Sequence, residues 1–165
     1  MTVQEDVMKS LKTLGLVMVL ALTLGAGCAK KAEVQTYAEV EENPATALEV
    51  AVQTITDGIV YFDYDKYDVK SEYTGMLQQK ADLMKAYPDI RVRIEGNCDE
   101  RGTQEYNLAL GERRARAVYD YMIMLGVNPA QLEMISYGKE RPAVAGNNEE
   151  AWALNRRDNF NVIAH

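Results

Sequence analysis

The chain has 165 residues, a formal net charge of −7 and a single histidine. That length allows one ordinary domain with an appendage, large enough to bury a core. An acidic chain without a basic stripe is a poor nucleic-acid binder, so we expect no nucleic-acid partner.

The N-terminus has the pattern of a secretory signal. Lys9 and Lys12 precede an apolar run over residues 14–24 that is too short to span a bilayer. Glu5 and Asp6 are out of place in a positively charged n-region, so we expect translation to start at Met8. Residues 1–27 are therefore predicted to be a signal peptide.

Cys28 follows the small residues 25–27, and this ending resembles a bacterial lipoprotein cleavage site. The resemblance implies that Cys28 becomes the lipidated first residue of the mature chain. Ala29 stands where lipoproteins kept in the inner membrane typically have Asp, which favours the outer membrane. An ordinary secretory signal followed by a chance cysteine is the alternative. With Cys28 acylated, Cys98 is the only thiol left and no internal disulfide is expected.

The segment 28–54 is rich in Ala, Glu and Val, contains Pro44 and has no sustained period. It is predicted to be the lipidated N-terminus followed by a flexible tether, with room for a short helix over residues 45–52. Residues 55–165 are predicted to form the folded domain.

The folded part alternates strands and helices. A short β-branched and aromatic run predicts a strand over 59–64, and strict alternation predicts another over 90–95, ended by Gly96. Further strands are predicted over 132–137 and 159–163. The last of these is unusually polar, which suggests an edge position.

Helical spacing predicts a first helix over 73–87, with Ser71 as N-cap and Pro88 just past its end. Thr103 is expected to cap a second helix that Gly126 stops, and a short helix is expected over 149–156. The second helix has an apolar stripe for the core, made of Leu108, Ala115, Val118, Tyr119, Met122 and Leu125. The β-α-β-α-β order predicts an α/β domain with helices packed on one or both faces of a small sheet.

Four separated segments carry a family resemblance: 60–69, 95–115, 135–144 and 155–157. Their sequence, order and spacing resemble the OmpA-like peptidoglycan-binding domain over roughly residues 55–165, and most closely its lipoprotein subgroup. The resemblance implies that this α/β domain is a two-layer α+β sandwich in which a small mixed sheet packs against two main helices. It also implies recognition of diaminopimelate at the free end of a peptidoglycan stem peptide, where an ammonium lies beside a carboxylate.

The resemblance places two charged side chains at the ligand. Asp99 falls where the family aspartate accepts hydrogen bonds from the ammonium, and Arg114 where a planar fork suits bidentate binding of the carboxylate. Asn107 and Leu110 share one helical stripe with Arg114, at positions i, i+3 and i+7. Without the resemblance, Asp99 as a turn cap and Arg114 as a surface ion pair would be the ordinary interpretation.

The lipoprotein subgroup adds Arg101, Tyr64 and Asp65 as a wall of the pocket. Backbone N–H groups near Thr103 are further candidate donors to an anion at the helix start. Cys98 precedes Asp99 where the family commonly has Thr or Ala. We expect it to pack as a small hydrophobe, with a lowered thiol pKa near Arg101 as the alternative.

An enzyme is the competing hypothesis, with Asp65 and Asp99 as the paired carboxylates of a wall-cleaving glycosidase. The Arg-rich surroundings, a lone histidine at the last position and the lack of a Cys/His cluster argue against it. We therefore expect a non-catalytic protein without cofactor or metal. The resemblance further implies a TolB-like periplasmic propeller protein as partner, with roles in envelope integrity and cell division. A structural lipoprotein with a protein ligand is another alternative.

Overall fold

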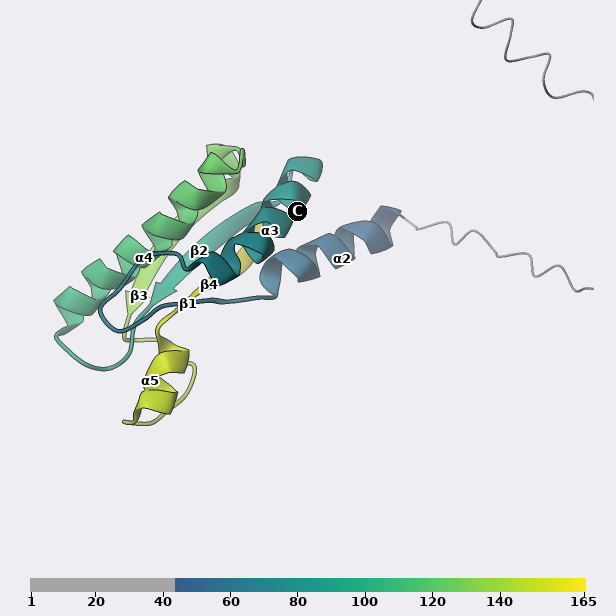
Figure 1. The fold of residues 1–165 in the computed structure, drawn as a ribbon. Coiled ribbons are helices and arrows are strands. Elements are labelled where there is room, and N and C mark those ends of the chain that lie inside the picture. The colour runs from purple at the N-terminus through teal and green to yellow at the C-terminus, as the bar shows by residue number, and fades with distance from the viewer. Residues whose placement is uncertain (1–43) are drawn as a thin grey trace, which may run out of the picture. The chain divides into compact units, whose positions relative to one another are not determined.

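The structure, a computed structural model, describes residues 44–165. The predicted signal peptide, the start at Met8, lipidation of Cys28 and the first part of the predicted tether lie outside the described residues. Residues 44–165 contain a four-stranded sheet with helices over one face (Figure 1). This arrangement is the two-layer α/β fold that the sequence predicts.

The sheet has the strand order β1-β4-β2-β3. The strands are β1 (Val60–Tyr61), β2 (Arg91–Asn97), β3 (Leu132–Gly138) and β4 (Arg157–Ala164). Strands β2 and β3 are parallel, whereas β4 runs antiparallel to both β1 and β2. The sheet is therefore mixed, and its parallel pair requires a crossover helix between β2 and β3.

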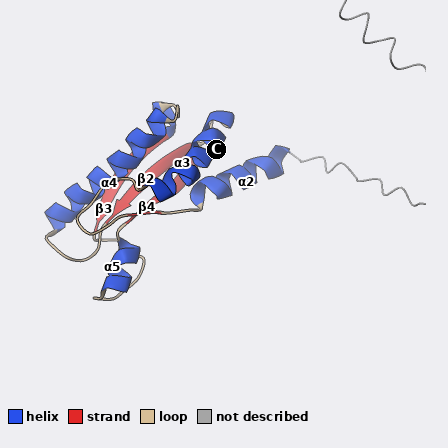
Figure 2. Ribbon diagram, in the orientation of Figure 1, coloured by secondary structure: helices blue, strands red, loops and turns tan. Residues whose placement is uncertain are grey.

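That crossover is α4 (Gln104–Met124), which packs on the sheet beside α2 (Pro44–Thr56) and α3 (Thr74–Ala86). A short 3₁₀ turn, η1 (Ser71–Tyr73), leads into α3, and a second, η2 (Pro129–Gln131), leads into β3. The short helix α5 (Glu149–Asn155) lies at one end of the sheet, away from the other three helices (Figure 2).

The core lies between the sheet and the helices. Its fully buried side chains include Leu77 and Met84 of α3, Val118 and Met122 of α4, and Ile94 of β2. Burying each such side chain contributes roughly 1.5–3 kcal/mol. Leu108, predicted in the core stripe of α4, is instead exposed, because the buried stripe of α4 passes through Asn107, Leu110 and Gly111 at its first turns.

Helix α2 extends the folded part to earlier residues than the sequence predicts. It spans Pro44–Thr56, so residues 44–54 of the predicted tether are helical and belong to the domain. Ala51 and Ile55 of α2 are buried, and Lys80 of α3 donates from Nζ to the carbonyl oxygens of Thr54 and Ile55. Helix α2 is therefore held by both apolar packing and hydrogen bonds at its C-terminus.

The last strand is not at an edge. Strand β4 lies between β1 and β2 and spans Arg157–Ala164, longer than predicted. Asn159 and Asn161 lie on the face of the sheet that no helix covers, and they are more exposed than their neighbours. Asp158 and Phe160 alternate with them and are buried toward the helices. A sheet with one solvated face shows this alternation in interior strands too.

The structure also differs from prediction at several helix and strand ends. Strand β1 covers only Val60–Tyr61, whereas a strand over 59–64 is predicted. Ser71 begins η1 and makes no side-chain cap, and α3 follows at Thr74. Gly96 does not end β2, which continues to Asn97. At α4 the predicted boundaries are confirmed, because Thr103 Oγ1 accepts from the Tyr106 backbone N–H and Gly126, at φ +90°, follows the helix.

Candidate functional site

A small cavity opens where β2 ends and α4 begins. It has a volume of about 110 Å³. Seven of the predicted site residues line it: Tyr64, Asp65, Asp99, Arg101, Asn107, Leu110 and Arg114. The structure therefore brings together residues from three separate parts of the chain. Thr103 is not among the lining residues; its side chain caps α4 instead.

Asp99 is buried and fully hydrogen-bonded. Arg101 donates to Asp99 Oδ1 from its backbone N and from Nε, both at 3.1 Å, and to Oδ2 from Nη2 at 2.7 Å. Arg156 Nη1 donates to Oδ2 at 3.4 Å. Burial raises the pKa of Asp99, but the hydrogen bonds and charge of Arg101 and Arg156 outweigh it and hold this pKa below its usual value.

Arg101 lies between two aromatic rings. Its guanidinium carbon is 4.1 Å from the ring centroids of both Tyr64 and Trp152. Its Nη1 is 3.8 Å from Glu149 Oε2. The hydrogen bond to Asp99 raises the pKa of Arg101, so its positive charge is permanent.

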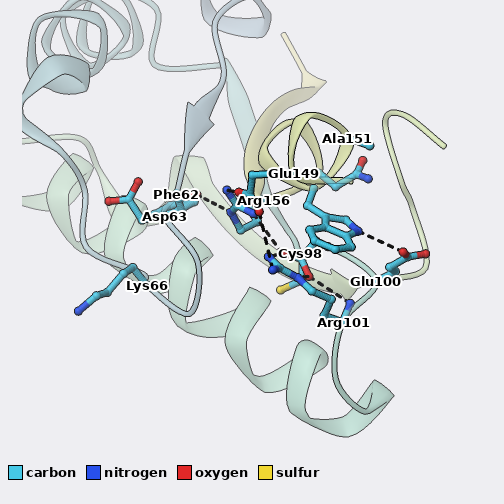
Figure 3. Close-up of polar contacts among 12 residues, drawn as sticks. Phe62, Asp63, Lys66, Cys98, Glu100, Arg101, Glu149, Ala151 and Arg156 are labelled. Carbon is cyan, nitrogen blue, oxygen red and sulfur yellow. Dashed lines mark hydrogen bonds and ion pairs between the residues drawn. The ribbon is translucent and has the colours of Figure 1, made fainter. Parts of the chain in front are cut away.

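Arg114 differs from the expectation. Its side chain is completely buried, and it donates to the carbonyl oxygens of Lys66 from Nε at 2.8 Å, Asn97 from Nη1 at 2.9 Å and Asp63 from Nη2 at 3.2 Å. These bonds connect α4 to the 63–66 loop and to the end of β2. Asp63 and Lys66 contribute only backbone atoms to these bonds, and their side chains point away from Arg101 (Figure 3).

Bidentate binding of a carboxylate by Arg114 would compete with these bonds, because Nε and both terminal nitrogens donate to carbonyl groups and Nη1 also contacts Cys98 Sγ at 3.4 Å. Burial lowers the pKa of Arg114. The guanidinium still contributes positive charge at the inner wall of the cavity, where a bound anion would benefit from it.

The loop after β1 supplies the outer wall. Tyr64 is exposed over the cavity, and Asp65 has φ +56°, a left-handed conformation that Asp tolerates. Asp65 Oδ1 accepts from the Tyr106 hydroxyl of α4, and this hydrogen bond raises the pKa of Tyr106. Tyr106 was not predicted as a site residue, since one tyrosine in a helix gives no signal of its contacts.

The start of α4 is joined to the loop before it. Asn107 Nδ2 donates to the carbonyl oxygens of Arg101 at 2.7 Å and Thr103 at 3.1 Å. Asn107, Leu110 and Arg114 all face the cavity, so the predicted stripe of α4 does lie toward the loop. Asn107 holds the loop that carries Arg101.

Cys98 packs in the wall of the cavity. It is 3% exposed, its thiol donates to the carbonyl oxygen of Asn107 at 3.3 Å, and burial raises its pKa to about 11. The alternative of a reactive thiol is wrong, because desolvation of the thiolate outweighs the positive charge of Arg114 nearby.

Three further site residues, besides Tyr106, were given no role by the sequence. Trp152 and Glu149 come from α5, and Arg156 follows it. Arg156 donates to the Phe62 carbonyl oxygen at 3.0 Å and to Glu149 Oε1 at 2.7 Å (Figure 3). Residues 155–157 were singled out only as one of the segments that carry the family resemblance. No residue pattern in the sequence around α5 indicated that this helix would lie against Arg101.

Within residues 44–165, no group of three or more His, Cys, Asp or Glu side chains is placed to hold a metal ion. In the same part of the chain, no helix has both the length and the apolar character needed to cross a membrane. The chemistry available at the cavity is ionic: its lining holds two carboxylates, Asp65 and Asp99, and two guanidinium groups, Arg101 and Arg114.

Comparison with known proteins shows the family of the chain. Residues 61–156 match the OmpA family. The peptidoglycan-associated lipoprotein of Pseudomonas putida is 54% identical over 109 residues, which cover 66% of this chain but only 64% of that relative. That of Rhizobium meliloti is 37% identical over 155 residues, covering 87% of this chain and 82% of the relative.

A crystal structure of the peptidoglycan-associated lipoprotein from Burkholderia pseudomallei matches this fold with a TM-score of 0.65 at 47% identity. The match covers 66% of this chain and 92% of that one. The likeness thus extends from sequence to tertiary structure over the part of the chain that forms the cavity.

Proposed function

The chain belongs to the OmpA family, and on that premise we propose that its cavity binds the diaminopimelate end of a peptidoglycan stem peptide. One observation carries the proposal: Asp99 and Arg101, of opposite charge, lie side by side in one small cavity. A ligand end with an ammonium beside a carboxylate is complementary to such a pair.

The cellular role that we propose is that of a non-catalytic anchor. Acyl chains on Cys28 would hold the outer membrane from the periplasmic side, each buried methylene contributing about 0.8 kcal/mol. The cavity would hold the cell wall. Many copies then give avidity even where a single site binds modestly. The names of the similar proteins, peptidoglycan-associated lipoproteins, support this assignment.

We also propose a TolB-like periplasmic propeller protein as a partner, in a Tol-Pal-type system that serves envelope integrity and cell division. The support is the similarity to the relatives described above. A structural lipoprotein whose cavity takes a protein ligand is the alternative, and it predicts no affinity for free stem peptide.

A wall-cleaving hydrolase is disfavoured by the electrostatics of the cavity. A catalytic acid needs a carboxyl whose pKa is raised by an apolar environment. At Asp99 the arginines have the opposite net effect, holding the pKa below its usual value. Asp99 is thus suited to remain ionised and accept hydrogen bonds.

The proposal is tested by calorimetric titration of the mature chain, with Cys28→Ser to remove the lipid, using a soluble stem peptide that ends in free diaminopimelate. We expect saturable binding that Asp99→Asn weakens by about 1.5–3 kcal/mol, the range for a charge-assisted hydrogen bond. Arg116→Ala, an exposed residue of α4 outside the cavity, serves as the control.

Retention of the parent affinity in Asp99→Asn would contradict the assignment of the cavity. Absence of binding by the parent would contradict the assignment of the ligand and favour a protein ligand. A pull-down with isolated cell-wall sacculi, using the same variants, extends the test to the intact polymer.

A further inference from the structure

Every acceptor position of the Asp99 carboxylate is occupied. A carboxylate offers about four lone-pair sites. Oδ1 accepts from the backbone N and Nε of Arg101, and Oδ2 accepts from Arg101 Nη2 and Arg156 Nη1. The Asp99 side chain is only 6% exposed. A ligand ammonium therefore cannot reach Asp99 unless one of these donors leaves.

The Arg101 side chain is the donor that can leave. Arg156 is 7% exposed and is held by the Phe62 carbonyl oxygen and by Glu149. The backbone N–H of Arg101 is fixed by the loop. The Arg101 side chain, in contrast, is 29% exposed and supplies two of the contacts through one rotatable group.

Arg101 also has supports that do not depend on Asp99. The rings of Tyr64 and Trp152, at 4.1 Å from the guanidinium carbon, provide cation–π contacts. Glu149 adds a negative charge at 3.8 Å. The guanidinium can therefore turn away from Asp99 and remain in the cavity wall.

We propose that a zwitterionic ligand enters by exchanging partners with the Arg101–Asp99 ion pair. The ligand ammonium takes the place of the Arg101 side chain on Asp99, and the Nε–Nη2 edge that Arg101 releases binds the ligand carboxylate. This inference rests on the proposed function and assigns the bidentate contact to Arg101, since the nitrogens of Arg114 already bind carbonyl groups.

The exchange makes the cavity selective for a ligand that carries both charges. An amine without a neighbouring carboxylate would displace Arg101 from Asp99 and leave the guanidinium edge unpaired. A carboxylate without an amine would remove Arg101 from Asp99 and leave part of a buried charge without a partner, which is costly. Only a zwitterion replaces both halves of the broken ion pair.

The test compares two stem peptides, one with diaminopimelate and one with Lys, which has the amine but lacks the second carboxylate. Each is titrated into the full mature chain, into Arg101→Ala and into the control Arg116→Ala. We expect the parent and Arg116→Ala to prefer the diaminopimelate peptide at least tenfold. In Arg101→Ala, Asp99 is open to any amine, so the Lys peptide should bind at least as tightly as it binds the parent, while the diaminopimelate peptide weakens tenfold or more.

A loss of the same factor for both peptides in Arg101→Ala would overturn the exchange while leaving the proposed function in place. Failure of the parent to bind either peptide would overturn both. Tryptophan fluorescence of the parent gives a second test that does not depend on a variant folding correctly. Trp152 is the one tryptophan of the chain and contacts the Arg101 guanidinium. Its fluorescence should change on titration with the diaminopimelate peptide, and an unchanged signal at saturation would count against movement of Arg101.

Discussion

Gly96 of β2 and Gly111 of α4 are in direct backbone contact: a Cβ atom placed on Gly96 would lie 2.0 Å from the Gly111 carbonyl oxygen. A Cβ atom on Gly111 would in turn lie 2.3 Å from Ser136 Oγ of β3. The helix that carries Arg114 and the strand that leads into Asp99 can approach this closely only because both positions are glycine.

Gly96→Ala should therefore destabilise the domain by more than about 3 kcal/mol, because the clash is with backbone atoms that have no alternative rotamer. The measurement is urea unfolding followed by circular dichroism. Gly75→Ala in α3 is the matched control, since nothing lies within 4 Å of its added Cβ atom. There we expect no loss, and up to about 1 kcal/mol of gain from helix propensity.

Arg114→Met should lower the free energy of unfolding by at least about 3 kcal/mol. The substitution leaves carbonyl groups of Asp63, Lys66 and Asn97 without their donor, and hydrogen bonds from a charged group are worth about 1.5–3 kcal/mol each. Arg114 is thus predicted to be needed for stability as well as for the charge of the cavity. Arg113→Met, at an exposed neighbouring position, should stay within about 0.5 kcal/mol of the parent.

Lys80→Met should loosen α2. The Lys80 ammonium is 1% exposed and donates to carbonyl oxygens at the end of α2, so that its loss should cost about 1.5–3 kcal/mol. Hydrogen exchange should locate the effect in residues 44–56. Lys85→Met is the comparison, since it removes exposed contacts away from α2: an ion pair to Asp82 and a hydrogen bond to the Leu125 carbonyl oxygen. Equal protection of α2 in both variants would contradict a role for Lys80 in holding it.

Asp158→Val should stabilise the domain at neutral pH. Both carboxylate oxygens of Asp158 are buried without a hydrogen-bond partner among the described residues. Burial raises the pKa of Asp158 well above its usual value, and the charges of Arg114 and Arg157 only partly oppose this shift. A carboxyl whose pKa is raised by folding favours the folded state below its unfolded pKa, and this contribution is lost as the pH rises through the folded pKa.

The gain from Asp158→Val should consequently be largest near about pH 8 and shrink toward about pH 4, close to the ordinary pKa of an aspartate. Denaturant unfolding of parent and variant across this range measures it. A difference that does not vary with pH would show that ionisation of Asp158 is not the source of the effect.

Much of the fold was predictable because its signals are local. Alternating residues indicated β2, helical spacing indicated α3 and α4, and Thr103 and Gly126 marked the ends of α4 through side-chain capping and a positive φ. The edge position predicted for the last strand was wrong, because polar residues are expected both on a solvated sheet face and at a sheet edge. Strand order distinguishes them, and it depends on pairing between distant segments.

The sequence by itself determined that Asp99, Arg101 and the 107–114 stripe lie near one another, since they adjoin one strand and one helix. Only the tertiary structure decided which partner each charged group has. Arg114 is held by carbonyl groups 48 and 51 residues earlier in the chain, and Trp152 reaches Arg101 from α5. The physical reason is that donors compete for acceptors in space, and the outcome of that competition depends on which groups packing has brought within hydrogen-bonding distance.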